Sequence, residues 1–229
     1  MYWILHHQLT SVMTPTIWYC YDAYCGWCYG FSPVIKKLYD NYKDQFAFDV
    51  LSGGMILNEQ PPHISGMAGY IANAYRSVEE MTGIKFGEDY LWHILNPDRS
   101  DWYPDSLKPA IALSVFKKFF PARAVEFAAD LQIALHFEGR DLTDDEAYRN
   151  LTEKYDLPTE SFYEFLHRES FKDNALYEFQ LVKQLQVTGY PCVLLQVNDS
   201  KFYMLAKGFT LYETLEENML KVLDELENR

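Results

Sequence analysis

Two cysteines separated by two residues are the most reactive feature of the sequence. Cys25 and Cys28 enclose Gly26 and Trp27 in a Cys-Gly-Trp-Cys motif. At the start of a helix, side chains three residues apart lie on one face, close enough for two sulfurs to bond. In a reducing compartment this spacing indicates redox chemistry or a metal site rather than a structural crosslink.

The elements around the motif place Cys25 at the beginning of a helix. Thr16–Tyr21 is rich in β-branched and aromatic residues and predicts a buried strand. Apolar residues recur every three or four positions over Gly26–Tyr42, which predicts a helix with Pro33 about one turn inside. Free backbone N–H groups and the helix dipole would stabilise a thiolate at Cys25, the candidate nucleophile. Cys28 is the candidate resolving thiol, which attacks the mixed disulfide and releases the product.

Strands are expected on both sides of a long helical block. Phe46–Leu51 predicts a second strand, so the sequence begins as βαβ, a parallel unit with a crossover helix. Near the end, Val193–Val197 and Phe202–Leu205 are apolar runs separated by a turn sequence, which predicts a hairpin. Gly208 breaks the chain after this hairpin, and a final helix is expected to run to Leu226.

The helical block shows helical periodicity almost throughout and no convincing strand. Its candidate helices are His63–Met81, Asp105–Phe119, Ala122–Phe137, Asp144–Tyr155, Glu160–Arg168 and Phe171–Gln186. Two pairs match the pattern in which a threonine and a glutamate cap a helix start, namely Thr143 with Glu146 and Thr210 with Glu213. We therefore expect threonine caps on one helix of the block and on the final helix.

The motif and its surroundings resemble the thioredoxin superfamily. Cys25-Gly26-Trp27-Cys28 follows a strand and opens a helix, and Pro33 stands where thioredoxin-like proteins place a helix-kinking proline. Tyr190-Pro191 precedes the hairpin, where the family has a cis-proline facing the active disulfide. The large helical block is similar to that of the DsbA-type branch, especially its FrnE-like oxidoreductases. The resemblance covers nearly the whole chain from Pro15 onward.

This resemblance implies an α/β chain with a thioredoxin-like fold, βαβ…ββα, interrupted by a large all-helical insertion. The discontinuous thioredoxin-like domain would comprise residues 13–61 and 187–229, and the inserted helical domain residues 62–186. Residues 1–12 show no clear period and form an N-terminal extension of uncertain origin.

The resemblance also implies roles for the residues around the cysteines. Cys25 and Cys28 are the catalytic pair; the substrate-binding residues are Tyr24, Trp27, Tyr190 and Pro191, and the supporting residues are Gly26, Asp22 and Pro33. Relatives keep a buried acid six positions before the first cysteine, where this chain has Tyr19. Asp22 is the nearest carboxylate, either a substitute proton acceptor or a helix cap. Because the Gly-Trp dipeptide lacks a histidine, we expect a more reducing pair than in strong oxidants.

The other cysteines and the histidines show no comparable pattern. A zinc site would need two ligands besides Cys25 and Cys28, and Cys20 and Cys192 are spaced unlike those of a zinc motif. Both lie in apolar strands and are expected in the core, with Cys192 close enough to the active pair to bond it under oxidation. The six histidines show no pairing with a nucleophile. No metal and no bound cofactor are therefore expected.

Composition and charge limit the partners and the location. The chain has 229 residues, of which 48% are hydrophobic and 23% charged, enough to build a substantial core. A net charge of −13 argues against nucleic acids and anionic membrane surfaces as partners. No segment approaches the roughly 20 apolar residues that cross a bilayer. The amino terminus also lacks the features of a signal peptide, so a cytoplasmic location is expected.

These observations favour a thiol–disulfide oxidoreductase that reduces or isomerises protein or peptide disulfides and is recharged by glutathione or a thioredoxin-type reductant. Two alternatives stay open. A glutathione-dependent isomerase or transferase of the kappa or hydroxychromene-carboxylate type shares the inserted topology but uses a serine at the reactive position. A non-catalytic protease adaptor or redox sensor with the same fold would bind its client without turnover.

Overall fold

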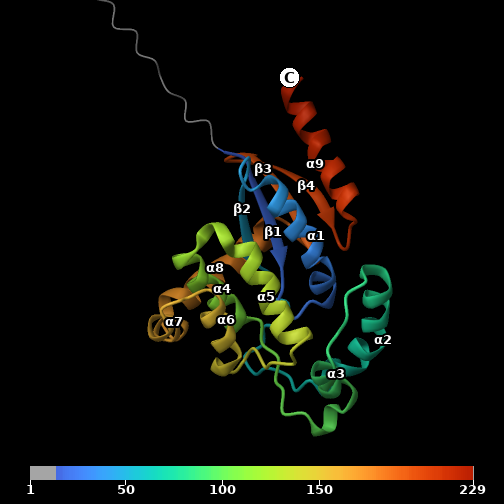
Figure 1. The fold of residues 1–229 in the computed structure, drawn as a ribbon, viewed down its shortest axis with the longest axis vertical. Coiled ribbons are helices and arrows are strands. Elements are labelled where there is room, and N and C mark those ends of the chain that lie inside the picture. The colour runs from blue at the N-terminus through green and yellow to red at the C-terminus, as the bar shows by residue number, and fades with distance from the viewer. Residues whose placement is uncertain (1–13, 229) are drawn as a thin grey trace, which may run out of the picture.

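A four-stranded sheet runs through the computed structural model of the chain, which describes residues 14–228 (Figure 1). Its strands are β1 (Thr16–Tyr21), β2 (Ala47–Ser52), β3 (Cys192–Asn198) and β4 (Lys201–Lys207), in the order β2-β1-β3-β4. β1 is parallel to β2 and antiparallel to β3, and β4 completes the expected hairpin with β3. The expected extension, residues 1–12, lies outside the described residues.

With one exception, the helices follow the order that the sequence predicts. α1 (Gly26–Tyr42) connects β1 to β2, and α9 (Tyr212–Glu227) follows β4. Between β2 and β3 the chain forms α2 (Ser65–Thr82), α3 (Glu88–Leu95), α4 (Leu107–Phe119), α5 (Ala124–His136), α6 (Arg149–Lys154), α7 (Thr159–Leu166) and α8 (Glu169–Gln184). The thioredoxin-like βαβ…ββα fold with an all-helical insertion is confirmed.

One inserted helix, α3, was not expected from the periodicity. It has only eight residues, with Tyr90 and Ile94 buried one turn apart. Its start is held against α5 by Gly87, where an added Cβ would lie 1.7 Å from the carbonyl oxygen of Phe137. The position of α3 therefore depends on this tertiary contact, because a helix this short is marginal by itself.

The two expected threonine caps are wrong. Asp144 is the cap, and its side chain accepts a hydrogen bond from the Glu146 N–H at 3.1 Å, while the Thr143 hydroxyl donates to Asp141 at 2.7 Å. The Asp144–Tyr155 segment is accordingly a short 3-10 turn followed by α6 rather than one helix. At α9, the Thr210 hydroxyl donates to the Gly208 carbonyl, and no side chain caps the helix. In both cases a nearer acceptor takes the threonine hydroxyl.

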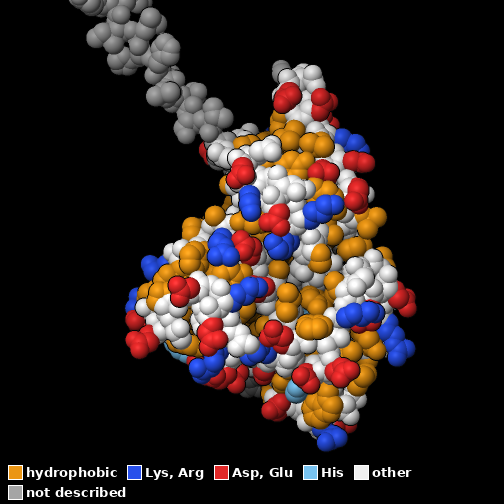
Figure 2. Space-filling model, viewed as in Figure 1, with side chains coloured by type: hydrophobic (Ala, Val, Ile, Leu, Met, Phe, Trp, Pro, Cys, Tyr) orange, Lys and Arg blue, Asp and Glu red, His pale blue; other side chains and the backbone are white. Residues whose placement is uncertain are grey.

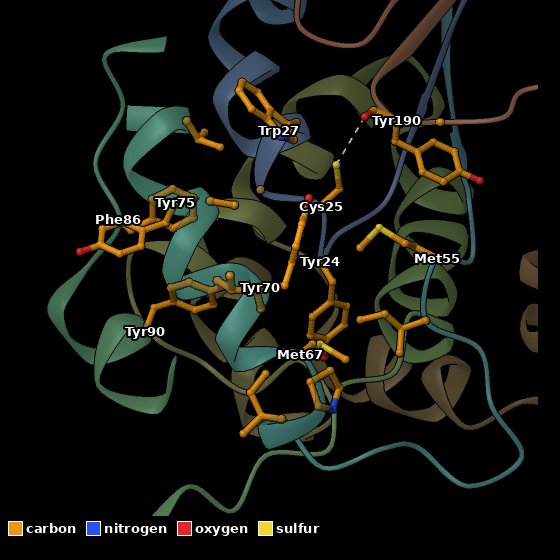
Figure 3. A pocket seen from close by; sticks show the side chains of 18 of the residues that line it. Tyr24, Cys25, Trp27, Met55, Met67, Tyr70, Tyr75, Phe86, Tyr90 and Tyr190 are labelled. Atoms are coloured by element: carbon orange, nitrogen blue, oxygen red, sulfur yellow. Dashed lines mark hydrogen bonds between the residues drawn. The ribbon is translucent and has the colours of Figure 1, made fainter. Parts of the chain in front are cut away.

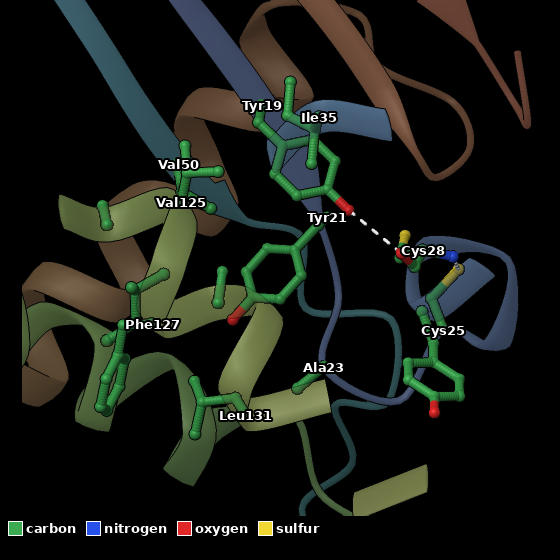
Figure 4. Packing of buried hydrophobic residues seen from close by; sticks show 14 of the residues in the cluster. Tyr19, Tyr21, Ala23, Cys25, Cys28, Ile35, Val50, Val125, Phe127 and Leu131 are labelled. Atoms are coloured by element: carbon green, nitrogen blue, oxygen red, sulfur yellow. Dashed lines mark hydrogen bonds between the residues drawn. The ribbon is translucent and has the colours of Figure 1, made fainter. Parts of the chain in front are cut away.

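Alternation along β1 divides the interior into two clusters. Ile17, Tyr19 and Tyr21 belong to a large cluster that includes buried residues of α1, β2 and α5 (Figure 4). Cys20 lies in a smaller cluster on the opposite face, because successive side chains of a strand point to opposite faces. The larger cluster joins the sheet to the inserted helices, so the insertion shares the core that supports α1.

α1 continues through Pro33 without interruption. A proline has no N–H to donate to the carbonyl four residues earlier, which here belongs to Tyr29. The hydroxyl of Ser32 donates to that carbonyl at 2.9 Å and replaces the missing hydrogen bond. The first turn of α1, which carries the cysteines, is therefore continuous with the rest of the helix.

Charges of both signs are mixed over the face of the molecule that Figure 2 shows. Lys and Arg side chains lie beside Asp and Glu side chains there, with hydrophobic groups reaching the surface between them. Among residues 14–228, none of the helices combines the length and apolar character needed to span a membrane.

Candidate active site

Cys25 is the N-terminal cap of α1. Its backbone is extended, with φ −83° and ψ 107°, and its sulfur accepts a hydrogen bond from the Cys28 N–H at 3.3 Å. A turn in which the Cys25 N–H donates to the Asp22 carbonyl at 3.1 Å leads into the helix. The sulfur therefore lies at the positive end of the helix dipole, with a backbone donor aimed at it, where negative charge is stabilised.

Cys28 lies one turn into the helix and is fully buried. Burial raises the pKa of the Cys28 thiol well above its ordinary value, and the neighbouring Cys25 adds to this effect. Tyr19 stands where relatives have an acid; its hydroxyl donates to the Cys28 carbonyl at 3.5 Å (Figure 4). Because burial also raises the pKa of Tyr19, that side chain is neutral near pH 7 and accepts no proton from Cys28.

The expected cis-proline is confirmed, since the Tyr190–Pro191 bond is cis. The Cys25 thiol donates to the Tyr190 carbonyl at a sulfur–oxygen distance of 3.8 Å (Figure 3). The Tyr190 ring turns toward the loop after β2, where its hydroxyl donates to the Gly53 carbonyl at 2.9 Å. A Cβ at Gly53 would lie 2.1 Å from this ring, so glycine is required there for the ring to fit. The structure thus brings the Cys-Gly-Trp-Cys motif and the cis-proline segment together.

Asp22 is a buried carboxylate rather than the cap of α1. One carboxylate oxygen accepts hydrogen bonds from the Tyr24 N–H and the Ser106 hydroxyl, both at 3.0 Å, and the other accepts from the Met55 N–H at 2.7 Å. Burial raises the pKa of Asp22, although these hydrogen bonds oppose the shift. Asp22 therefore ties the cysteine loop to the loop after β2 and to the start of α4.

Two buried polar residues of α5 lie behind the cysteine loop. The side-chain amide of Gln132 donates to the carbonyls of Asp22 and Cys25 at 3.3 and 3.4 Å. His136 stacks on Tyr29 with ring centroids 5.0 Å apart, and burial lowers its pKa to about 3, so it is neutral. Neither role was expected from the sequence. The available signal was two polar residues four positions apart on a helix face that is otherwise apolar.

A cavity of about 520 Å³ opens beside Cys25 (Figure 3). Tyr24, Trp27 and Tyr190, three of the expected substrate-binding residues, line it together with Gly26. The opposite wall consists mainly of apolar and aromatic residues of the insertion, namely Ile64, Met67, Tyr70, Ile71, Ala74, Tyr75, Val78, Phe86, Tyr90, Trp102 and Pro104. Pro33 lies outside this lining, on the exposed side of α1.

The remaining cysteines lie apart from this site. Cys20 and Cys192 are directly opposite one another on β1 and β3 and belong to the smaller cluster, whereas Cys25 and Cys28 belong to the larger one. Cys192 thus packs with Cys20 rather than with Cys25 and Cys28. Within residues 14–228, no group of three or more His, Cys, Asp or Glu side chains could hold a metal ion.

Comparison with known families agrees with the geometry. The model of the DSBA-like thioredoxin domain family matches residues 16–219, and the chain belongs to this family. No curated protein sequence matches the chain significantly.

Three solved structures show how closely the fold is shared. A candidate protein disulfide isomerase from Nitrosomonas europaea has a TM-score of 0.81 at 21% identity, covering 93% of this chain and 99% of that one. The cytosolic disulfide reductase DsbM from Pseudomonas aeruginosa has a TM-score of 0.74 at 22% identity, with coverages of 93% and 100%. A 2-hydroxychromene-2-carboxylate isomerase has a TM-score of 0.62 at 13% identity, with coverages of 93% and 98%. At these low identities, the TM-scores and coverages show that the fold is shared over nearly the whole chain.

Proposed function

We propose that the chain is a thiol–disulfide oxidoreductase that reduces or isomerises disulfides of proteins or peptides through Cys25 and Cys28. The observation that carries this proposal is the position of the Cys25 sulfur. It accepts the Cys28 N–H at the start of α1 and faces both the cavity and the cis-proline segment. A thiolate there would be stabilised, and a disulfide could reach it through the cavity although only 6% of Cys25 is exposed, which is what nucleophilic exchange needs.

In the proposed reaction, the Cys25 thiolate attacks one sulfur of the substrate disulfide. A bond forms between Cys25 and that sulfur, the substrate S–S bond breaks, and the other sulfur leaves as a thiolate that takes a proton from water. The Cys28 thiol then loses its proton and attacks Cys25, which releases the second substrate thiol. The substrate gains two electrons, and the cysteine pair is left as a disulfide that an external thiol reductant must reduce.

Other residues would assist these steps. Tyr24, Trp27, Tyr190 and Pro191 would hold the substrate chain beside the cysteines. The Asp22 carboxylate would accept the proton of Cys28, whose pKa its charge influences. Glutathione or a thioredoxin-type protein would supply the electrons, and the cytoplasm is the proposed location. The similarity to DsbM supports both the reductant and the location, because DsbM is a cytosolic disulfide reductase whose structure was also solved with GSH.

The test is turnover of a disulfide-bonded peptide in a glutathione buffer by the wild type, Cys25→Ser and Cys28→Ser. We expect multiple turnovers by the wild type and none by Cys25→Ser. Mass spectrometry should find a trapped mixed disulfide on Cys28→Ser. Equal, negligible rates in all three proteins would refute the proposal and favour a non-catalytic adaptor, which would still bind its client as the Cys25→Ser variant.

A glutathione-dependent isomerase or transferase is the second candidate. The apolar cavity beside Cys25 favours it, since such an enzyme must hold an organic substrate next to the thiol. An isomerase of this type would not need a resolving thiol. Retention of isomerase activity by Cys28→Ser, with no disulfide turnover by the wild type, would select this candidate.

A further inference from the structure

Ser106 precedes α4, where a serine would ordinarily cap the helix, but its hydroxyl makes no such bond. The residue is buried, with 2% of its surface exposed. Its N–H donates to the Ile56 carbonyl at 2.9 Å, and its hydroxyl oxygen accepts from the Ile56 N–H at 3.0 Å. The hydroxyl hydrogen is then free to point at Asp22 Oδ1, 3.0 Å away. The loop after β2 therefore orients this hydroxyl as a donor toward Asp22.

The hydroxyl differs in kind from the other donors to Asp22. Tyr24 and Met55 contribute backbone N–H groups at 3.0 and 2.7 Å, and an N–H can only donate. A hydroxyl can also rotate and accept a hydrogen bond. While Asp22 is ionised, all three groups stabilise its charge, and when Asp22 takes up a proton, Ser106 can adapt to the change.

The buried titratable side chains around Asp22 are neutral near pH 7. The charge of Asp22 acts on four of them, one from each neighbouring segment: Tyr21 of β1, Tyr24 of the cysteine loop, Cys28 of α1 and Tyr190 before the cis-proline. Burial raises the pKa of each above its ordinary value. On α5, burial lowers the pKa of His136 to about 3. None of this set gains or loses charge between about pH 4 and about pH 8, so a change there reports on Asp22.

The nearby carboxylates have partners of their own. Asp105, next to Ser106, accepts the Leu107 N–H at 2.9 Å. On α8, Glu178 pairs with Lys117 at 2.8 Å. Burial is the largest cause of the raised pKa of Asp22, and its hydrogen bonds, including that from Ser106, oppose the shift. Removing the Ser106 hydroxyl should therefore raise this pKa further.

We propose that Ser106 is a positioning residue of the resolving step, whose hydroxyl aims the Asp22 carboxylate and keeps it able to accept the proton of Cys28. The inference rests on the proposed function and deepens it. In this step the Cys28 proton passes to a carboxylate oxygen, a bond forms between Cys28 and Cys25, and the bond between Cys25 and the substrate sulfur breaks. The substrate leaves as a thiolate that takes a proton from water. The Ser106 hydroxyl then turns to accept a hydrogen bond from the protonated carboxyl.

The test is the rate of thiol release from a preformed Cys25–peptide mixed disulfide, measured over a series of pH values. In the wild type the rate should rise with the ionised fraction of Asp22 and reach a plateau. In Ser106→Ala the midpoint of this rise should move up by about one pH unit, with rates about tenfold lower below the midpoint and equal at the plateau. A merely structural defect would instead lower the rate by one factor at every pH.

Matched variants separate the hydroxyl from the fold around it. Ser106→Thr keeps a hydroxyl and should restore the wild-type midpoint. Ser114→Ala removes another buried serine hydroxyl of α4, which lines a different pocket beside Lys117, and should also keep that midpoint. If Ser106→Ala does not fold, Ser106→Gly removes the same hydroxyl and should give the same shift.

A double variant tests whether Ser106 acts through Asp22. Adding Ser106→Ala to Asp22→Asn should not change the rate further, because no carboxylate is left to position. The carboxyl carbon resonance of Asp22, followed by NMR, should show the same shift of midpoint without any reaction. Equal midpoints in the wild type and Ser106→Ala, or an equal fall in rate with and without Asp22, would overturn the inference and leave the proposed function standing. Failure of the wild-type mixed disulfide to release thiol would refute the proposed function, and with it the step that Ser106 assists.

Discussion

The chain contains two pairs of cysteines in different surroundings. Cys25 and Cys28 share the first turn of α1 beside a cavity, whereas Cys20 and Cys192 face each other across β1 and β3 inside an apolar cluster. A helix N–H points at the Cys25 sulfur. Burial instead raises the pKa of Cys192 to about 11 and also raises that of Cys20. Proximity of two thiols is therefore common to both pairs. Burial raises the pKa of Cys28 as well, so the difference lies in Cys25, whose sulfur accepts a backbone N–H and which lines the cavity.

A buried carboxylate near each pair extends the contrast. Asp22, on the side of the active pair, accepts three hydrogen bonds, and no ion pair with it occurs within the described residues. Glu178, whose charge acts on Cys20, is paired with Lys117 at 2.8 Å. Burial raises the pKa of both carboxyls, but the Lys117 ammonium opposes the shift at Glu178, whereas at Asp22 only hydrogen bonds oppose it.

The largest expected difference between the pairs is in alkylation of the folded protein. Iodoacetamide should modify Cys25 directly, because its sulfur lines the cavity. Cys20 and Cys192 should react only when the structure opens. Their alkylation rates should therefore be lower than that of Cys25 by a factor of at least about 10³. Peptide mass spectrometry at timed intervals measures all the rates. In denaturant, as the control, the four cysteines should react alike; rapid labelling of Cys192 in the native protein would contradict the comparison.

Removing the charge of Asp22 should slow the second chemical step. If Asp22 accepts the proton of Cys28, Asp22→Asn should slow release of thiol from a preformed Cys25–peptide mixed disulfide by about a hundredfold. Stopped-flow measurement of thiol release gives the rate. Glu178→Gln is the matched control, because it removes a buried carboxylate near the other pair and should leave this rate unchanged. Equal rates for Asp22→Asn and the wild type would exclude Asp22 as the acceptor.

The same variant tests the pH dependence of stability. Because burial raises the pKa of Asp22 in the folded state above its unfolded value, folding favours the protonated carboxyl. Its contribution is present at low pH and is lost as the pH rises through the folded pKa. The free energy of unfolding of Asp22→Asn relative to the wild type should therefore increase between about pH 4 and about pH 7. Chemical denaturation at both pH values measures this difference, and a decrease would show that the pKa is lowered instead.

The rate at which Cys28 resolves the mixed disulfide should also depend on pH. Burial raises the pKa of Cys28, so only a small fraction is thiolate near neutral pH. In Asp22→Asn, where no carboxylate takes the proton of Cys28, resolution of the mixed disulfide should accelerate about tenfold per pH unit from neutral into the alkaline range. The rate of thiol release at a series of pH values checks this, with Cys28→Ser as the blank. A flat profile would mean that another step limits release.

Local sequence patterns predicted a Cys-Gly-Trp-Cys motif at the start of a helix because the signals for it are local. The motif, β1 and α1 lie within one short stretch, and the structure has the last two with the expected bounds. Pro191 was expected from a resemblance that spans the chain. Contacts such as that between Ser106 and Asp22 join residues 84 positions apart and have no local signature. The sequence predicted a helix for α2 but not that it lines the cavity, because the pattern of apolar residues is the same whether a helix faces a core or a cavity.

The smallest effect is expected for Cys192→Ala. The side chain is buried beside Cys20, Leu51 and Val182, and its removal leaves a small cavity, which should lower the free energy of unfolding by about 1 kcal/mol. Peptide disulfide turnover should stay unchanged, although this residue directly follows the cis-proline. Denaturant titration and the turnover assay measure the two quantities. If turnover fell while stability held, Cys192 would exchange with the active pair, and the separation of the two cysteine pairs would be incomplete.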